Sequence, residues 1–103
     1  MNFSDKVLML TRKIPKGKIT TYSEIARALG KPGASRAVGN ALNKNKHPGR
    51  TPCYRVVRSD GSLGGYSSGA KEKIRLLKRD GIKIRNGKID LKKHFQSFVH
   101  HAK

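Results

Sequence analysis

The chain contains a single cysteine, Cys53, among its 103 residues. One thiol cannot close a disulfide within the chain, and the length fits one small domain with a modest hydrophobic core. Four uses remain for Cys53: a buried apolar residue, an inert surface thiol, a metal ligand or a nucleophile. Pro52 fixes a backbone dihedral before it, and Arg55 adds positive charge two residues later. Because positive charge favours the thiolate, we expect a reactive cysteine at a stiff turn.

The charge balance points to a polyanionic partner. The chain has 24 Lys and Arg residues against 6 Asp and Glu residues, a formal net charge of +18. Such a field attracts nucleic acid, most of whose non-specific affinity comes from phosphate contacts. A membrane surface would require a basic amphipathic helix with bulky apolar anchors, and the chain has no Trp and three Phe. We expect nucleic acid and no membrane; charge that only maintains solubility is the alternative.

Further classes of protein are disfavoured by simple patterns. The apolar run Val7–Leu10 is too short for a transmembrane helix. The N-terminus has no signal-like segment and the lone cysteine fits a reducing compartment, so we expect a cytoplasmic protein associated with chromosomal DNA. None of the four histidines stands at a zinc-site spacing from Cys53. We therefore expect neither a metal nor a cofactor.

Two short helices in the first half predict a helix-turn-helix. Thr21 and Glu24 form a T-x-x-E capping box at the start of one helix, and Gly30 is its natural stop. The next helix is expected from Arg36 to about Lys44. Two helices joined by a tight Gly/Pro turn are typical of this motif, with the second helix as the DNA reader.

The second half predicts a small β element. The dipeptide Asn86-Gly87 between alternating apolar segments is the strongest short signal for a β-hairpin. A two-residue loop would give three cross-strand pairs: Ile84 with Ile89, Ile82 with Leu91, and Lys83 with Asp90.

The remaining elements complete the predicted fold. Apolar spacing predicts an N-terminal helix ending near Lys13 and another helix over Ala70–Asp80, with a short strand over 54–58 between them. The predicted fold class is mainly α with a small β element, a winged-helix-like DNA-binding domain containing a helix-turn-helix. Residues 1–103 are expected to form one domain, with a frayed tail beyond about residue 96.

Several ordered motifs resemble one family. The chain is similar, over about Phe3–Phe95, to the C-terminal active-site domain of O6-alkylguanine-DNA alkyltransferases. The motifs that carry the resemblance are Ile19–Tyr22, Glu24–Ala26, Ser35–Ala41, Asn45, Pro52–Val57, Gly61, Gly64, Tyr66, Ser67, Lys73, Leu76, Leu77, Asp80 and Gly81.

The resemblance implies repair of DNA by direct reversal. A protein of this family flips an O6-alkylated guanine, chiefly O6-methylguanine, out of double-stranded DNA and transfers the alkyl group irreversibly to a cysteine, once per molecule. It binds through the minor groove, and we expect a monomer. Cys53 would be the acceptor, and Arg36 would fill the gap left by the base. Tyr22 would crowd the target phosphate, and Asn45 would brace the active-site turn.

The implied substrate pocket and its activating network involve five further positions. The backbone carbonyls of Cys53 and Val56 would hold the guanine amino group, while Tyr66 and Ser67 would line the pocket. The family usually has histidine after the cysteine, whereas this chain has Tyr54, and the acidic partner matches Asp80. A phenol, with an unperturbed pKa of ~10, is a poor base near neutrality. Either a Cys53–Tyr54–Asp80 network relays hydrogen bonds, or the cationic surroundings of Cys53 do most of the activation.

Other readings stay open at this point. Proteins of the alkyltransferase-like class bind alkylated guanine and recruit repair factors without an acceptor cysteine, and a plain basic DNA-binding protein is a third class. Among single residues, Arg36 could contact only phosphate, Tyr22 and Tyr66 could be packing residues, and Asp80 could simply close its helix. The lysines of segment 71–93 are expected to form a solvated face.

Overall fold

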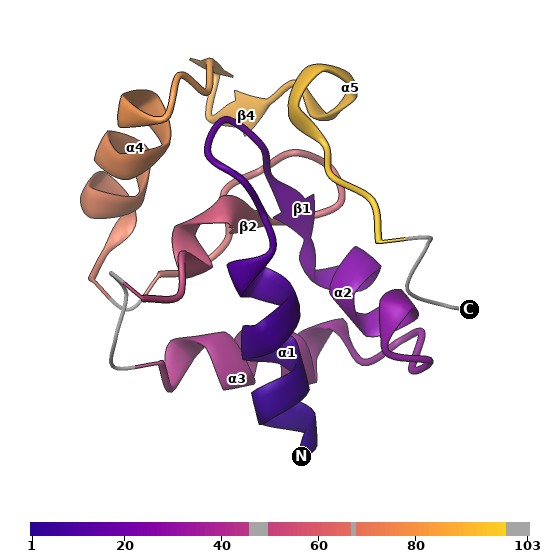
Figure 1. Cartoon of the computed structure of the whole chain (residues 1–103). Coiled ribbons are helices and arrows are strands. Elements are labelled where there is room, and N and C mark those ends of the chain that lie inside the picture. Colours follow the sequence, from indigo (N-terminus) through magenta and orange to yellow (C-terminus); the bar gives the residue numbers. More distant parts are fainter. Residues whose placement is uncertain (46–49, 67, 99–103) are drawn as a thin grey trace.

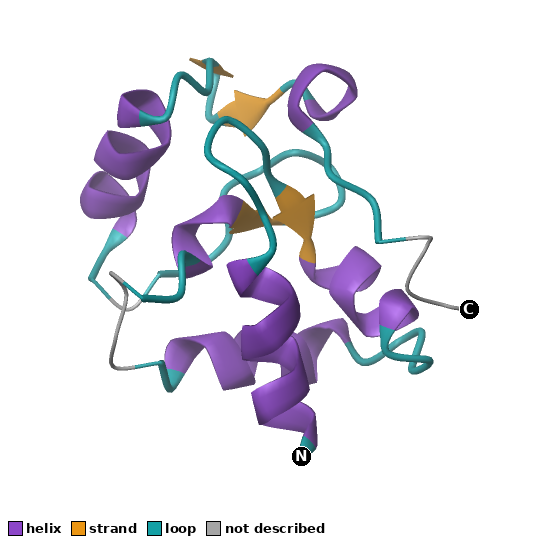
Figure 2. Cartoon of the chain, in the orientation of Figure 1, coloured by secondary structure: helices purple, strands orange, loops and turns teal. Residues whose placement is uncertain are grey.

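The computed structural model describes residues 1–45, 50–66 and 68–98 (Figure 1). Within these ranges, α-helices pack around one small sheet, and a second small sheet lies at the edge of the molecule (Figure 2). The helices are α1 (Phe3–Arg12), α2 (Tyr22–Ala28), α3 (Ser35–Asn43), α4 (Ala70–Arg79) and α5 (Leu91–His94), with a 3-10 turn at Cys53–Arg55. The strands are β1 (Thr20–Thr21), β2 (Val56–Val57), β3 (Ile84–Arg85) and β4 (Lys88–Ile89).

The first three helices enclose the larger of two apolar clusters. Asn2 caps α1 by accepting a hydrogen bond from the backbone N–H of Asp5 at 2.8 Å. The apolar face predicted for this helix is buried, with Val7 and Leu10 packed against α2 and α3. The second cluster joins α4 to the two sheets. Burial of these faces fixes α1 across the helix pair that follows it.

The predicted helix-turn-helix is present as α2 and α3, and the fold class is confirmed. The hydroxyl of Thr21 accepts from the backbone N–H of Glu24 at 3.0 Å, which forms the predicted cap. The carboxylate of Glu24, however, bonds Arg27 and the C-terminal segment. Gly30 ends α2 at φ +75°, a left-handed conformation that glycine adopts without strain.

A short parallel ladder connects this motif to the segment around Cys53. Thr20 pairs with Val56 and Thr21 with Val57, so β1 leads directly into α2 and β2 follows directly on the 3-10 turn. The strand predicted over 54–58 is limited to Val56–Val57 because the preceding residues form that turn. The ladder places the start of the helix-turn-helix beside the cysteine segment.

The predicted β-hairpin is present but shorter than expected. Asn86 and Gly87 have φ of +54° and +74°, the pattern of a type I′ turn, and Ile84 pairs with Ile89. The predicted pairs Ile82–Leu91 and Lys83–Asp90 are wrong. The Asp90 side chain accepts instead from the backbone N–H of Lys92 at 3.1 Å and caps α5, a role that carboxylates commonly take at a helix start.

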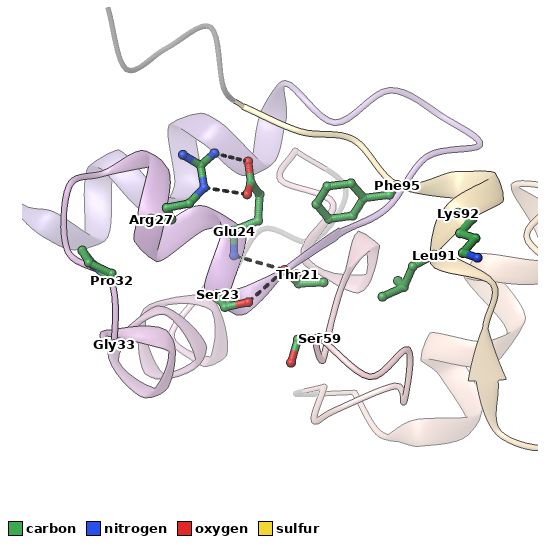
Figure 3. A pocket seen from close by; sticks show the side chains of 10 residues that line it. All are labelled: Thr21, Ser23, Glu24, Arg27, Pro32, Gly33, Ser59, Leu91, Lys92 and Phe95. Carbon is green, nitrogen blue, oxygen red and sulfur yellow. Dashed lines mark hydrogen bonds and ion pairs between the residues drawn. The ribbon is translucent and has the colours of Figure 1, made fainter.

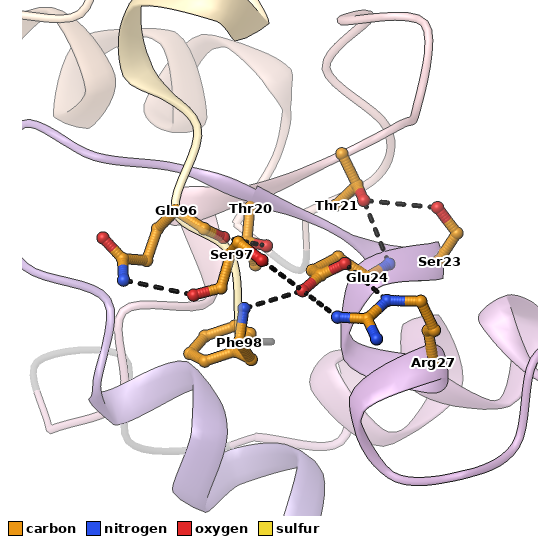
Figure 4. Close-up of polar contacts among 8 residues, drawn as sticks. All are labelled: Thr20, Thr21, Ser23, Glu24, Arg27, Gln96, Ser97 and Phe98. Atoms are coloured by element: carbon orange, nitrogen blue, oxygen red, sulfur yellow. Dashed lines mark hydrogen bonds and ion pairs between the residues drawn. The ribbon is translucent and has the colours of Figure 1, made fainter. Parts of the chain in front are cut away.

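The segment after α5 is docked, so the expected fraying beyond residue 96 is wrong as far as Phe98. The backbone N–H of Gln96 donates to the carbonyl of Ile19 at 2.7 Å, which extends the tail beside β1. Figure 4 shows the Glu24 carboxylate receiving the backbone N–H of Phe98 at 2.7 Å and the hydroxyl of Ser97 at 3.3 Å. The part of the expected tail beyond 98 lies outside the described residues.

Glu24 therefore anchors the C-terminal segment to the helix-turn-helix. Burial alone would raise the pKa of Glu24, but hydrogen bonds from Arg27 and the Phe98 backbone outweigh it and lower that pKa. The carboxylate thus stays ionised and holds Phe98 where its ring, 1% exposed, fills the core between α1, α2 and α3.

Replacing Phe98 with alanine is expected to lower the free energy of unfolding by about 3–5 kcal/mol, because a buried aromatic ring leaves a cavity. Phe95→Ala is the matched control: its ring is 36% exposed, so we expect a loss below about 1.5 kcal/mol. Urea unfolding followed by circular dichroism measures both. Equal losses in the two variants would contradict a docked tail.

Candidate functional site

Cys53 lies at the first position of the 3-10 turn, and its thiol is held by Asn45, two residues beyond the end of α3. The side-chain amide of Asn45 donates to Sγ at 2.8 Å and to the carbonyl of Thr51 at 3.2 Å. The thiol faces the carbonyl of Leu42 at 3.8 Å, and Cys53 is 7% exposed. Asn45 thus ties the cysteine turn to the end of the helix-turn-helix, which fixes the sulfur beside α3.

The ionisation of Cys53 differs from the expectation. Burial raises the pKa of the thiol, and the opposing influences of the Asn45 hydrogen bond and the charges of Lys73 and Arg12 do not overcome it. Lys73 and Arg12 thus favour the thiolate, as expected of nearby cations, but burial outweighs them in the free protein. Cys53 rests as the thiol, and any reaction at the sulfur must include removal of its proton.

Tyr54 and Asp80 are hydrogen-bonded to each other, in a cluster with Arg55. The phenol of Tyr54 donates to Oδ2 of Asp80 at 2.8 Å, and Nε of Arg55 donates to the same oxygen at 2.9 Å. Nη2 of Arg55 donates to the hydroxyl oxygen of Tyr54 at 2.9 Å, and Nη1 of Arg55 donates to the carbonyl of Ile14 at 2.8 Å. In the described residues, the Tyr54 hydroxyl and the Cys53 thiol share no direct hydrogen bond.

Arg55 is the residue that the sequence did not identify in this cluster. The side chain of Asp80 is 1% exposed, and its Oδ1 has no hydrogen-bond partner among the described residues. Arg55 supplies the neutralising charge, and Asp80 is also the residue that closes α4. The cluster therefore joins the segment after α1, the cysteine turn and α4, and it gives Asp80 a structural role at the end of α4.

Tyr22 and Arg36 lie on one concave surface between α3 and residues 63–66, which we call the glycine-rich loop. With Gly39, Gly64 and other residues they line a hollow of about 370 Å³. Gly64 has φ +73°, and a Cβ there would lie 2.8 Å from the Tyr22 oxygen, so only glycine permits this approach. Arg36 is exposed on the first turn of α3. A duplex that lay along α3 would meet both side chains.

Tyr66, another expected pocket residue, packs against the apolar cluster that contains Cys53, although Cys53 is not among the residues that line the hollow beside Tyr66. Tyr66 is half-buried and packs against both apolar clusters, and with Pro52, Tyr54 and Arg55 it lines a hollow of about 470 Å³. Burial raises the pKa of the Tyr66 phenol, which keeps it protonated as a hydrogen-bond donor near neutral pH. Ser67 lies outside the described residues.

Lys73 is buried completely, whereas the sequence placed the lysines of segment 71–93 on a solvated face. Its Nζ donates to the carbonyls of Val56 at 2.8 Å and Gly65 at 3.1 Å, and to the Tyr22 oxygen at 3.5 Å. A signal for this was available, since position 73 precedes Leu76 and Leu77 by three and four residues on the apolar face of α4. Lys73 connects α4, β2 and the glycine-rich loop to Tyr22.

Burial lowers the pKa of Lys73 to about 8. Above this pH the folded protein loses a proton that the unfolded chain retains up to its ordinary pKa of ~10.4, so this group makes stability rise with pH in that window. We expect wild type to gain about 2 kcal/mol relative to Lys73→Met between about pH 7.5 and about pH 9.5. If the unfolding free energies of the two proteins changed by the same amount over this pH range, the proposed titration of Lys73 would be contradicted.

The comparison with Lys73→Met is needed because other groups titrate with the opposite sign. The pKa values of Cys53 and Tyr22 are raised by burial, so these groups keep protons that the unfolded chain loses and they reduce stability as pH rises. Both groups are present in wild type and variant. The difference between their urea unfolding free energies therefore reports Lys73 together with its electrostatic interaction with Cys53.

A further hollow, of about 710 Å³, is not lined by Cys53. Figure 3 shows it between α2 and α5, with the ring of Phe95 and the ion pair of Glu24 and Arg27 at its edge. Neither Cys53 nor Asn45 belongs to its lining. The described residues contain no helix with the length and apolarity to cross a membrane. They also contain no group of three His, Cys, Asp or Glu side chains placed to hold a metal ion.

Comparisons with known proteins agree on one family. The family model "6-O-methylguanine DNA methyltransferase, DNA binding domain" matches residues 2–82. The chain is 53% identical over 90 residues to a bifunctional methyltransferase/endonuclease of Picrophilus torridus, covering 86% of this chain and 30% of that protein. It is 43% identical over 82 residues to a methylated-DNA–protein-cysteine methyltransferase of Methanothermobacter thermautotrophicus, covering 80% and 46%. The chain thus spans half or less of these relatives.

Solved structures add two points of reference. Atl1 of Schizosaccharomyces pombe, in complex with damaged DNA containing O6-carboxymethylguanine, matches with a TM-score of 0.84 at 30% identity, covering 92% of this chain and 94% of that one. The O6-methylguanine methyltransferase of Mycobacterium tuberculosis matches with a TM-score of 0.70 at 39% identity, covering 78% and 48%.

Proposed function

Because the chain belongs to the 6-O-methylguanine DNA methyltransferase family, we propose that it is a single-turnover repair protein that moves an alkyl group from O6-alkylguanine in duplex DNA onto Cys53. We propose further that it corresponds to the family's C-terminal active-site domain, acts as a monomer in the cytoplasm, and approaches DNA through the minor groove with α3. The observation that carries the proposal is the Cys53 thiol, held by Asn45 between α3 and the glycine-rich loop.

The proposed transfer balances without a cofactor. Sulfur forms a bond to the alkyl carbon, and the bond from that carbon to O6 breaks with its electron pair moving to the guanine. The thiol loses one proton and the departing guanine gains one, so the products are a thioether and unmodified guanine. The Asn45 amide stabilises negative charge on the sulfur, and the Tyr66 phenol is a donor suited to the developing charge on O6.

Access to the base requires its removal from the stack, which costs a few kcal/mol. We propose that Arg36 occupies the vacated space and that Tyr22 presses on the phosphate of the target nucleotide; their position on one concave surface supports this. The carbonyl of Val56 already accepts from Lys73, but its second lone pair can accept the guanine amino group. The carbonyl of Cys53 and the Ser67 backbone complete the proposed pocket.

A non-enzymatic damage sensor is the second candidate. It is favoured by the structural match to Atl1, solved in complex with damaged DNA, whose TM-score of 0.84 exceeds the 0.70 of the Mycobacterium tuberculosis methyltransferase. Such a protein would bind O6-alkylguanine DNA and leave the lesion intact. The thiol of Cys53 favours the transferase, since a sensor needs no acceptor.

Lesion conversion separates the two candidates. A duplex with one O6-methylguanine is titrated with protein, the DNA is digested, and guanine and O6-methylguanine are quantified. We expect one lesion converted per protein molecule, and no more after longer incubation. Tight binding that leaves the lesion intact would support the damage sensor instead of the transferase. Equal affinity for damaged and undamaged duplex would contradict both and would support a basic DNA-binding protein.

Tyr54 offers a test of how the sulfur is activated. Its hydroxyl bonds Asp80 and Arg55, so we expect Tyr54→Phe to reduce the transfer rate less than about tenfold, whereas an essential proton relay would contribute about a hundredfold or more. Single-turnover rates of wild type, Tyr54→Phe and Tyr54→His decide this. An inactive wild type that Tyr54→His restores would contradict the proposed activation.

A further inference from the structure

We propose that the end of the molecule opposite α3 is a second binding surface for double-stranded DNA, so that one protein molecule holds two duplex segments. This goes beyond the proposed repair activity and needs no alkyl transfer. The end of α4, the hairpin β3–β4 and α5 lie together at this end, away from α3 (Figure 1). We call their exposed cations the distal basic surface: Lys78, Lys83, Arg85, Lys88, Lys92 and Lys93.

The positive charge of this surface is only partly offset within the protein. Among the described residues, none of the six cations forms an ion pair with a carboxylate. Asp80 is buried with Arg55. Two exposed carboxylates lie within reach of the surface: Asp90 caps α5, and the pKa of Asp60 is lowered by hydrogen bonds within its own turn and in part by the charge of Lys88. Protein surfaces usually intersperse both signs of charge, and a single-sign field favours an anionic partner.

The hairpin carries an unfavourable pair that a phosphate would relieve. Arg85 stands directly opposite Lys88 in the ladder, and like charges at such positions destabilise a hairpin. The tight turn at Asn86 and Gly87 fixes both residues on adjacent strands. A hollow of about 460 Å³ beside the pair is lined by Lys78, Lys83 and Arg85, which gives a phosphate backbone a concave seat.

The geometry requires two duplexes rather than one. The molecule measures 33 × 29 × 21 Å, and α3 and the distal basic surface lie at its opposite ends. DNA has a persistence length of about 150 base pairs, so a duplex of about 20 base pairs cannot bend around the protein to reach both. A membrane fits the surface less well since, among the exposed large apolar side chains of the described residues, Met1, Met9 and Phe95, only Phe95 lies beside it, next to Lys92.

A capture assay with undamaged DNA tests the proposal independently of repair chemistry. A duplex of about 20 base pairs is immobilised and saturated with protein, and binding of a second, labelled duplex is measured. We expect wild type to capture it, and Arg85→Gln/Lys88→Gln to capture several-fold less. The slope of log affinity for the second duplex against log salt concentration should fall by about 2.

A charge-matched control excludes a general effect of lower net charge. Lys6→Gln/Lys13→Gln removes the same charge from exposed positions on and beside α1 and should capture the second duplex like wild type. The hairpin variant should unfold no earlier than wild type on heating, because it loses a repulsive pair. Equal capture by both double variants would overturn the proposal. So would no capture by wild type, whether or not phosphatidylserine vesicles bind this surface instead. Failure of lesion conversion would leave this assay unaffected.

Discussion

Cys53→Ser is expected to abolish alkyl transfer while the variant still binds a duplex containing O6-methylguanine. The change replaces one atom at a position held by Asn45 and Leu42, so the turn keeps its shape. A serine hydroxyl is far less acidic than a thiol, and the described hydrogen-bond partners of Cys53 are an amide and a backbone carbonyl, neither of which is a strong base. Loss of the nucleophile therefore removes the reaction and spares the surface along α3.

Two measurements on this variant are needed together. Lesion conversion reports the chemistry, and fluorescence anisotropy with lesion and control duplexes reports binding. Conversion by Cys53→Ser at the rate of wild type would show that another residue accepts the alkyl group. Loss of binding together with conversion would show that the thiol contributes to the fold of the turn, and the variant would then not identify the acceptor.

Arg55→Met is expected to destabilise the protein by about 3–5 kcal/mol, because it leaves the carboxylate of Asp80 buried without a compensating charge. That carboxylate is 1% exposed, and Arg55 contacts it at 2.9 Å while also bonding Tyr54 and the carbonyl of Ile14. The methionine fills much of the same volume, so the lost interactions, rather than a cavity, dominate the change.

Arg79→Met is the matched control for this substitution. Arg79 lies 4.0 Å from the same carboxylate, but its side chain is 58% exposed, so solvent screens the pair. We expect a loss below about 1 kcal/mol. Urea unfolding of the three proteins measures both values. Equal losses for the two arginines would contradict the role assigned to the buried cluster.

The features that the sequence predicts correctly are local. Thr21 caps α2 through a residue three positions away, and Asn86-Gly87 defines its turn through backbone conformations that few residues adopt. The spacing of Val7 and Leu10 likewise marks the buried face of α1. Each depends on residues within one turn of chain, so propensity and pattern are sufficient.

The features that the sequence misses depend on distant contacts. Asp90 could pair with Lys83 or cap the next helix, and the cap formed because α5 begins there. Phe98 is docked by Glu24, which lies 74 positions earlier in the chain. The complete burial of Lys73 depends on two carbonyls from other segments. For Cys53, nearby positive charge was visible, but the burial that raises its pKa was not.

Peptide-resolved mass spectrometry tests the central claim most directly. Wild type is incubated with an excess of duplex containing O6-methylguanine, digested, and compared with protein incubated with undamaged duplex. We expect the peptide containing Cys53 to gain a single methyl group in nearly every molecule, with fragment ions placing it on the sulfur. An unmodified Cys53 peptide from protein that is bound to the lesion, or a methyl group on any other residue, would contradict it.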